Sequence, residues 1–164
     1  MLFKRFSYFK FFLKSSNQHG VHSPFVYDFV TKGLYEKGNY TVELQDFNFH
    51  EKLSNKEEKI LKKIIVYFNP TSIITTDNNE NISLDKNVNL LYFKYLSAHS
   101  VDKFRTIYPN SCIVFKSIYQ NKNTLKNWEQ IIQLQEATVT IDLFYFGLIF
   151  FRKKQAKEHF KIRV

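Results

Sequence analysis

The chain has 164 residues, which fits one domain, and 44% of them are hydrophobic, too many for a disordered protein. Lysine and arginine number 24 against 15 acidic residues, a formal net charge of +9 that favours polyanionic partners or an anionic membrane surface, although compositional drift gives the same balance. One cysteine excludes a disulfide framework and suits a reducing cytosol, so we expect a cytoplasmic protein, and no apolar run approaches the ~20 residues that span a bilayer.

Residues 2–14 are predicted to form a helix that carries Phe, Tyr and Leu over most of its surface, with cations between them. Such a helix could lie on an anionic membrane, or it could pack on the rest of the fold or on a second subunit, which would give a homodimer. Packing is the favoured interpretation, because the basic residues do not gather on one clean face.

A second helix is predicted to begin at Ser23 and to end near Gly33. Ser23 is a good N-cap residue, and Pro24 suits the first helical position, where no backbone N–H is needed. His19 and His22 precede it with a spacing that can suit a metal. No carboxylate or thiol lies near them in the sequence, so a local structural role is favoured.

A third helix is predicted from Ser54 to Phe68. Ser54 and Glu57 have the spacing of a capping box, in which each residue bonds the backbone of the other. Apolar residues at helical period follow, with lysines opposite them. Residues 69–70, Asn-Pro, are predicted to end this helix.

Strands and helices alternate in the rest of the chain. The predicted strands cover 72–76, 88–96, 111–118, 138–144 and 148–151, and the predicted helices lie near 99–107 and 124–133. This alternation predicts a mostly parallel sheet. The last two strands, joined by residues 145–147, are too close for a crossover helix and predict an antiparallel hairpin. Residues 159–164 alternate in polarity and predict a short edge strand.

The segments over residues 19–26 and 139–153, with the tail over 155–160, carry a resemblance to class I S-adenosylmethionine-dependent methyltransferases, in particular to a bacterial group similar to the small O-methyltransferases. Residues 19–26, HGVHSPFV, resemble the N-terminal signature of that group. Residues 139–153, VTIDLFYFGLIFFRK, and the tail over 155–160 resemble its C-terminal part. The resemblance covers both ends of the chain well and the middle weakly. It implies a Rossmann-like sheet, whose seven strands have the order 3-2-1-4-5-7-6, and S-adenosylmethionine as the family's cofactor.

The middle of the chain leaves no room between Ser83 and Val88 for the family's second and third strands. We therefore expect an α/β protein with a reduced Rossmann-like methyltransferase fold, a mostly parallel sheet of about five strands in the order 1-4-5-7-6. Residues 1–50 would form an N-terminal helical segment, and residues 51–164 the truncated methyltransferase-like domain, together one compact unit.

The turn that would bind the cofactor has lost its glycines. By the resemblance, the family's acidic residue falls on Thr75 and its glycines fall on Asp77 and Asn81, whose side chains would fill the space meant for the ligand. The chain has four glycines in all: Gly20, Gly33, Gly38 and Gly147. The strand that would carry the acidic residue for the cofactor ribose is missing as well.

The family's metal-binding acids, at the ends of its strands 4 and 5, correspond to Lys94, Lys116 and Ser117. Ammonium groups cannot hold a divalent cation, which needs oxygen ligands. We therefore expect no catalytic residue, no metal site and no bound cofactor. Lys94 and Lys116 at one rim would instead attract phosphate or sulfate, although solvated lysines at strand ends are the simpler interpretation.

The main hypothesis is a methyltransferase-like protein without catalytic activity, either a remnant or a binding or scaffold domain. The first alternative is an active S-adenosylmethionine-dependent methyltransferase with an altered cofactor site. A further alternative is a basic module on nucleic acid or on a membrane surface, whose binding would weaken as salt is raised.

Overall fold

The computed structural model describes residues 2–38, 40–44, 49, 52–76, 90–95, 97–99, 101, 105 and 110–164. Asp77 and Asn81 lie outside the described residues, as does most of the helix predicted over 99–107.

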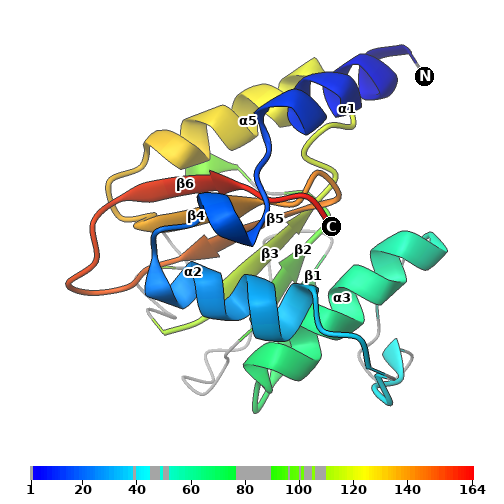
Figure 1. Cartoon of the computed structure of the whole chain (residues 1–164). Helices are drawn as coiled ribbons and strands as arrows, with labels where there is room; N and C mark the ends of the chain where they lie inside the picture. Colours follow the sequence, from blue (N-terminus) through cyan, green and yellow to red (C-terminus); the bar gives the residue numbers. More distant parts are fainter. Residues whose placement is uncertain are drawn as a thin grey trace.

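A six-stranded sheet forms the centre of the protein (Figure 1). Its strands are β1 (Ile73–Thr76), β2 (Leu90–Phe93), β3 (Cys112–Lys116), β4 (Val139–Asp142), β5 (Phe146–Phe150) and β6 (Glu158–Lys161). Their order is β1-β2-β3-β5-β4-β6, and each neighbouring pair is parallel except the two that β5 forms with β3 and β4. The protein is therefore α/β with a mostly parallel sheet, which is compatible with a Rossmann-like fold.

The strand order differs from the five-stranded prediction because β6, which overlaps the edge strand predicted over 159–164, adds a sixth strand beside β4. The hairpin turn also lies earlier than predicted. Residues 143–145 form it, whereas Phe146 and Gly147 belong to β5. Gly147 is needed for packing, because a Cβ atom there would lie 2.6 Å from the ring of Trp128.

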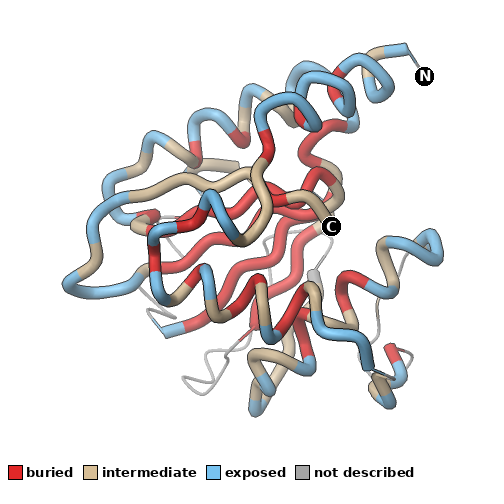
Figure 2. Tube along the Cα trace, viewed as in Figure 1, coloured by how far each residue is buried: buried red, intermediate tan, exposed pale blue. Residues whose placement is uncertain are grey.

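Helices cover both faces of the sheet (Figure 1). On one face lie α1 (Leu2–Lys14) and α5 (Lys122–Gln133), and on the other lie α2 (Pro24–Asp28), the π-helical turn η2 (Phe29–Leu34) and α3 (Asn55–Phe68). Successive strand residues point to opposite faces. Leu90, Tyr92 and Val114 therefore join the core under α3, whereas Leu91, Phe93 and Ile113 join the core under α5. Figure 2 shows the resulting buried strands between half-exposed helices.

The ends of helices α3 and α2 can be compared with the caps predicted from the sequence. The Ser54–Glu57 capping box is present, and Asn69 ends α3 in the left-handed conformation with φ 41°. Ser23 occupies the N-cap position of α2, but the predicted cap bond is absent. Its hydroxyl instead accepts a hydrogen bond from Gln155 Nε2 at 3.0 Å. No helix within the described ranges is both long enough and apolar enough to cross a membrane.

Candidate functional site

The two lysines predicted at strand ends lie at neighbouring positions on the carboxyl edge of the sheet. Phe93 at the end of β2 pairs with Phe115 of β3, so Lys94, directly after β2, and Lys116, the last residue of β3, follow neighbouring strands. Tyr92 and Val114 point toward α3, and residues two positions further along a strand share that face. Lys116 therefore leaves the sheet on its α3 side, whereas Lys94 lies in the bend that follows β2.

Each of these lysines already has a neighbour. Lys116 is 6% exposed, and its charge acts on Glu57 at the start of α3. Burial alone would raise the pKa of Glu57, but hydrogen bonds from Ser54 and the charges of Lys116 and Lys4 hold that pKa below its usual value. The Lys94 ammonium lies 5.6 Å from the centre of the Tyr95 ring. Ser117, which follows Lys116, takes a left-handed backbone with φ 66°.

Asp142, at the end of β4, is fully buried. The Tyr119 hydroxyl donates to its Oδ2 at 2.5 Å, the backbone N–H of Phe144 donates to its Oδ1 at 2.8 Å, and the Lys161 ammonium lies 3.9 Å away. Burial raises the pKa of Asp142 to about 6 despite these partners. Both carboxylate oxygens are engaged, so Asp142 holds the hairpin turn to the loop after β3.

Aromatic rings fill the carboxyl edge next to this carboxylate. Phe144, with φ 67°, stacks on Tyr119 at a ring distance of 4.9 Å and contacts Phe11 and Tyr8 of α1 at 5.5 and 4.9 Å. The cavity bounded by these α1 residues and by residues 143–145 is about 90 Å³. Small-molecule sites usually measure about 300–1,000 Å³, so this corner of the edge is packed rather than open.

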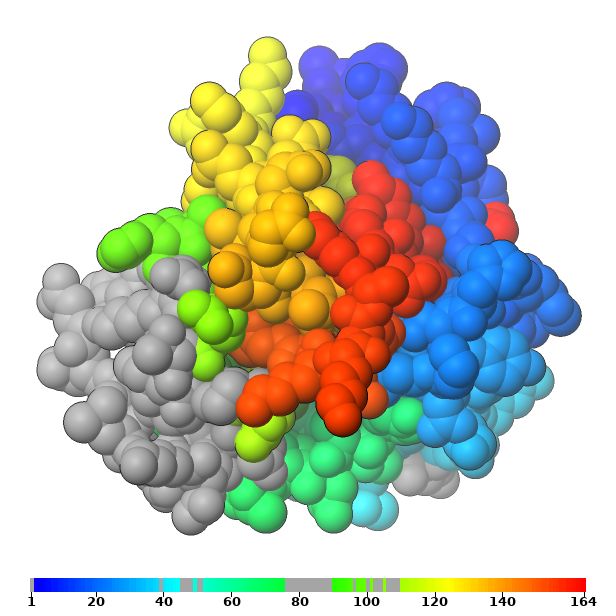
Figure 3. All heavy atoms as spheres, turned by 90° about the vertical axis from the view of Figure 1, so that its left-hand side faces the viewer, coloured from blue at the N-terminus to red at the C-terminus, as the bar shows by residue number. Residues whose placement is uncertain are grey.

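A larger cavity, about 540 Å³, lies at the opposite, amino edge of the sheet. Figure 3 faces this edge, with the loop that precedes β6 toward the viewer. Apolar and polar side chains both contribute to the lining, which consists of Phe25, Phe68, Asn110, Ser111, Cys112, Phe150, Phe151, Arg152 and Lys153. The Arg152 guanidinium lies 4.0 Å from the centre of the Phe25 ring, and its Nε donates to Gln155 Oε1 at 2.9 Å. Such a lining suits a ligand with an apolar body and an anionic group.

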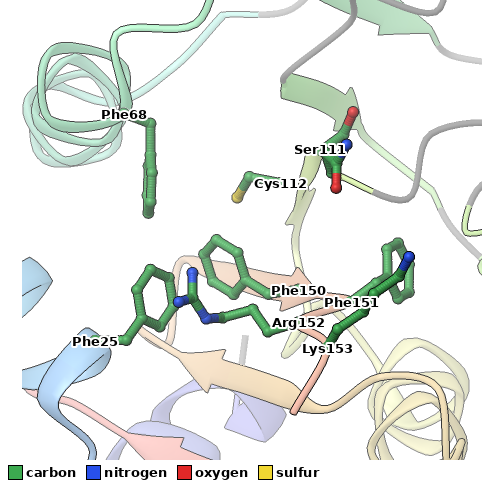
Figure 4. Close-up of a pocket in the computed structure, with 9 residues that line it drawn as sticks. Phe25, Phe68, Ser111, Cys112, Phe150, Phe151, Arg152 and Lys153 are labelled. Atoms are coloured by element: carbon green, nitrogen blue, oxygen red, sulfur yellow. The ribbon is translucent and has the colours of Figure 1, made fainter. Parts of the chain in front are cut away.

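Figure 4 shows the Cys112 sulfur directed toward Phe68 inside this cavity. Cys112 is buried, and burial raises its pKa well above the usual value, which keeps the thiol protonated and a weak nucleophile. Sequence reasoning missed the cavity, because its walls come from α2, α3, β3 and β5, which form no motif along the chain. The one local signal is the Arg152–Lys153 pair, which begins two residues after the end of β5.

Histidines build no metal site in the part of the chain that the structure describes. There, no three His, Cys, Asp or Glu residues come close enough to hold an ion. His19 and His22 are both exposed. His159 of β6 was not singled out from the sequence. Its Nδ1 lies 2.9 Å from Thr140 Oγ1, and burial lowers its pKa to about 4, so the ring is neutral.

The predicted cofactor positions are only partly described. Thr75 lies in β1, which pairs with β2 and is the terminal strand of the sheet over the described ranges. Asp77 and Asn81 fall outside those ranges. Comparison of the chain with protein-family models, with curated proteins and with solved structures gives no match in any of the three.

Proposed function

We propose that the chain is a non-catalytic relative of the class I S-adenosylmethionine-dependent methyltransferases that serves as a binding or scaffold domain. The observation that carries the proposal is the chemistry of the carboxyl edge, where this class of sheet binds its ligands. The ends of β2 and β3 carry Lys94 and Lys116. The resemblance would put metal-binding acids at these positions.

The described carboxylates near this edge are engaged in structural bonds. Glu57 Oε2 accepts from the Ser54 backbone N–H at 2.8 Å and from the Ser54 hydroxyl at 2.6 Å. Asp142 has no exposed surface and accepts from Tyr119 and Phe144. A general base must reach the proton that it removes, and a metal needs free oxygen ligands. Asp142 offers neither without breaking its present bonds, and Glu57 Oε2 is already held by Ser54, which supports a non-catalytic protein.

The test is titration calorimetry of the full chain with S-adenosylmethionine. We expect no binding in the micromolar range that is ordinary for a working cofactor site. A micromolar dissociation constant would contradict the proposal and favour the active methyltransferase with an altered site. The double variant Asp77→Gly/Asn81→Gly restores the glycines that the resemblance implies. If this variant alone binds, loss of those glycines is what removed the cofactor.

Anion binding at Lys94 and Lys116 is a second candidate function, favoured by their neighbouring positions at the carboxyl edge. A phosphate would compete with Glu57 for the charge of Lys116. Phosphate should therefore raise the melting temperature relative to chloride at equal ionic strength, and magnesium should not. Lys94→Gln should remove this effect, and Lys153→Gln, at the amino edge, should keep it. A phosphate effect that survives Lys94→Gln would assign the anion to another place.

A further inference from the structure

Helix α1 has a second apolar side, which faces solvent. Leu2, Phe6, Phe9 and Leu13 are 72%, 65%, 61% and 67% exposed. Their spacing of four, three and four residues puts them in one stripe along the helix. Ser7 and Phe11, on the opposite side, are the buried residues of α1. The helix thus packs on the protein by one side and presents large hydrophobic side chains on the other.

Cations flank this stripe, and α1 contains no acidic residue. At about 100° per residue, Arg5 and Lys10 lie about 70° to either side of the middle of the stripe. Lys4 and Lys14 are also exposed. Figures 1 and 3 show α5 beside α1 on the same face of the sheet. There α5 adds the exposed Lys122 and Lys126 against Glu129.

We propose that α1 docks on an anionic lipid membrane, lying in the headgroup plane with the stripe toward the acyl chains. An apolar stripe of Phe and Leu between cations is the pattern of a helix that binds an anionic interface. The helix has 13 residues, fewer than the ~20 that span a bilayer, so it lies in the surface. The charges of Arg5 and Lys10 then meet the lipid phosphates.

A second copy of the chain fits this stripe less well. Pairing two α1 stripes would bring Arg5 and Lys10 of each copy against the same cations of the other. With no acidic residue in α1 to pair with them, these charges would repel. Charge complementarity therefore favours an anionic surface over self-association.

The test is flotation of the full chain with vesicles of equimolar phosphatidylcholine and phosphatidylserine, compared with phosphatidylcholine alone. We expect a partition coefficient at least about tenfold higher on the anionic vesicles, falling as salt is raised. Failure to float with anionic vesicles, or equal binding to both compositions, would overturn the proposal.

Matched variants assign the binding to the stripe. Phe6→Ser/Phe9→Ser should lower the anionic partition coefficient at least about tenfold. Tyr27→Ser/Val66→Ser removes two other exposed apolar side chains, on the opposite layer, and should leave it unchanged. Circular dichroism of each variant checks that the fold is kept. Equal losses in the two double variants would overturn the proposal.

Sedimentation velocity without lipid separates the membrane from the second copy. We expect a monomer. A wild-type dimer that Phe6→Ser/Phe9→Ser converts to a monomer would show that the stripe is a subunit interface and would overturn the membrane proposal. The inference is independent of the proposed function, because S-adenosylmethionine binding would leave vesicle binding unchanged.

Discussion

The two edges of the sheet are built in opposite ways. At the carboxyl edge, aromatic rings and hydrogen-bonded charges around Asp142 leave a cavity of about 90 Å³. At the amino edge, rings and cations line a cavity of about 540 Å³. Doubly wound sheets usually hold their ligands at the carboxyl edge. The difference predicts that exposed side chains at the amino edge, such as Arg152 and Lys153, can change with less effect on folding than the buried side chains around Asp142.

The largest effect is expected from Gly147→Ala, near the start of the antiparallel strand β5 and therefore near the carboxyl edge of the sheet. The new Cβ would lie 2.6 Å from the Trp128 ring, which is buried and therefore has neighbours on its other sides. Both neighbouring strands, β3 and β4, hold the backbone of Gly147 in place. Overpacking of this kind should lower the free energy of unfolding by about 3 kcal/mol, measured by urea denaturation.

Gly38→Ala is the matched control, because a Cβ at Gly38 meets nothing within 4 Å. It should change the free energy of unfolding by less than about 0.5 kcal/mol or stabilise slightly. If both variants lost a similar amount of unfolding free energy, close contact with Trp128 would not be the reason that position 147 requires glycine.

A pH effect is the next in size. The pKa of Asp142 is raised from 3.8 to about 6 in the folded protein, so between about pH 4 and 6 the folded state holds a proton that the unfolded state has lost. The stability that the protonated Asp142 carboxyl gives the folded state is therefore lost as the pH rises through this window. Asp142→Asn removes the titration. The variant should gain on the order of 2–3 kcal/mol relative to wild type from pH 4 to pH 7, measured by urea denaturation.

The effect of pH on stability through His159 has the opposite sign, so His159 serves as the internal control. Its pKa is lowered from 6.5 to about 4, so stability is lost as the pH falls below about 6.5. His159→Gln should therefore lose less stability than wild type on acidification. If Asp142→Asn and His159→Gln changed the pH dependence of the free energy of unfolding in the same direction, the opposite pKa shifts of the two groups would be contradicted.

Local sequence patterns were sufficient to predict the helices and strands, but they were insufficient to predict the contacts between side chains around Asp142. The capping box of α3 and its apolar stripe lie within 15 residues of each other in the sequence, so they could be predicted. The bond between Tyr119 and Asp142 joins residues 23 apart, and no pattern predicts it. Ser23 takes the predicted N-cap position, but its hydroxyl accepts from Gln155, 132 residues away, and makes no bond to the helix backbone, which no local pattern predicts.

The outward stripe of α1 illustrates the same limit. Aromatic residues surround the helix, so its period does not tell which side packs. The contacts of Phe11 with Tyr119 and Phe144 settle the buried side, and the exposed side follows from them. The amino-edge cavity likewise required the tertiary structure, since its lining comes from four elements.

Arg152→Ala tests the amino edge and should have a small effect. It removes the contact with the Phe25 ring and the bond to Gln155, while its backbone N–H still donates to Thr138 Oγ1 at 2.8 Å. An exposed cation–π contact contributes about 0.5–1 kcal/mol, so the variant should lose no more than that by urea denaturation. Lys153→Ala, beside it at the rim, is the control. A loss as large as that of Gly147→Ala would break the comparison of the two edges.

The reactivity of Cys112 tests whether the amino-edge cavity admits small molecules, and it needs no change in the stability of the fold. The thiol lines the cavity but is buried, and its raised pKa keeps it protonated, so both access and reactivity are low. Native protein should react with iodoacetamide at least about a hundredfold more slowly than protein in urea, because reaction requires local opening. The chain has a single cysteine, so mass spectrometry after the reaction reports on Cys112 alone. Phe68→Ala removes the ring toward which the sulfur points and should speed the reaction, whereas Val66→Ala, exposed on the same helix, should not. Fast labelling of the native wild type would mean that the cavity already opens onto the thiol, and the amino edge would then accept ligands without any rearrangement of Phe68.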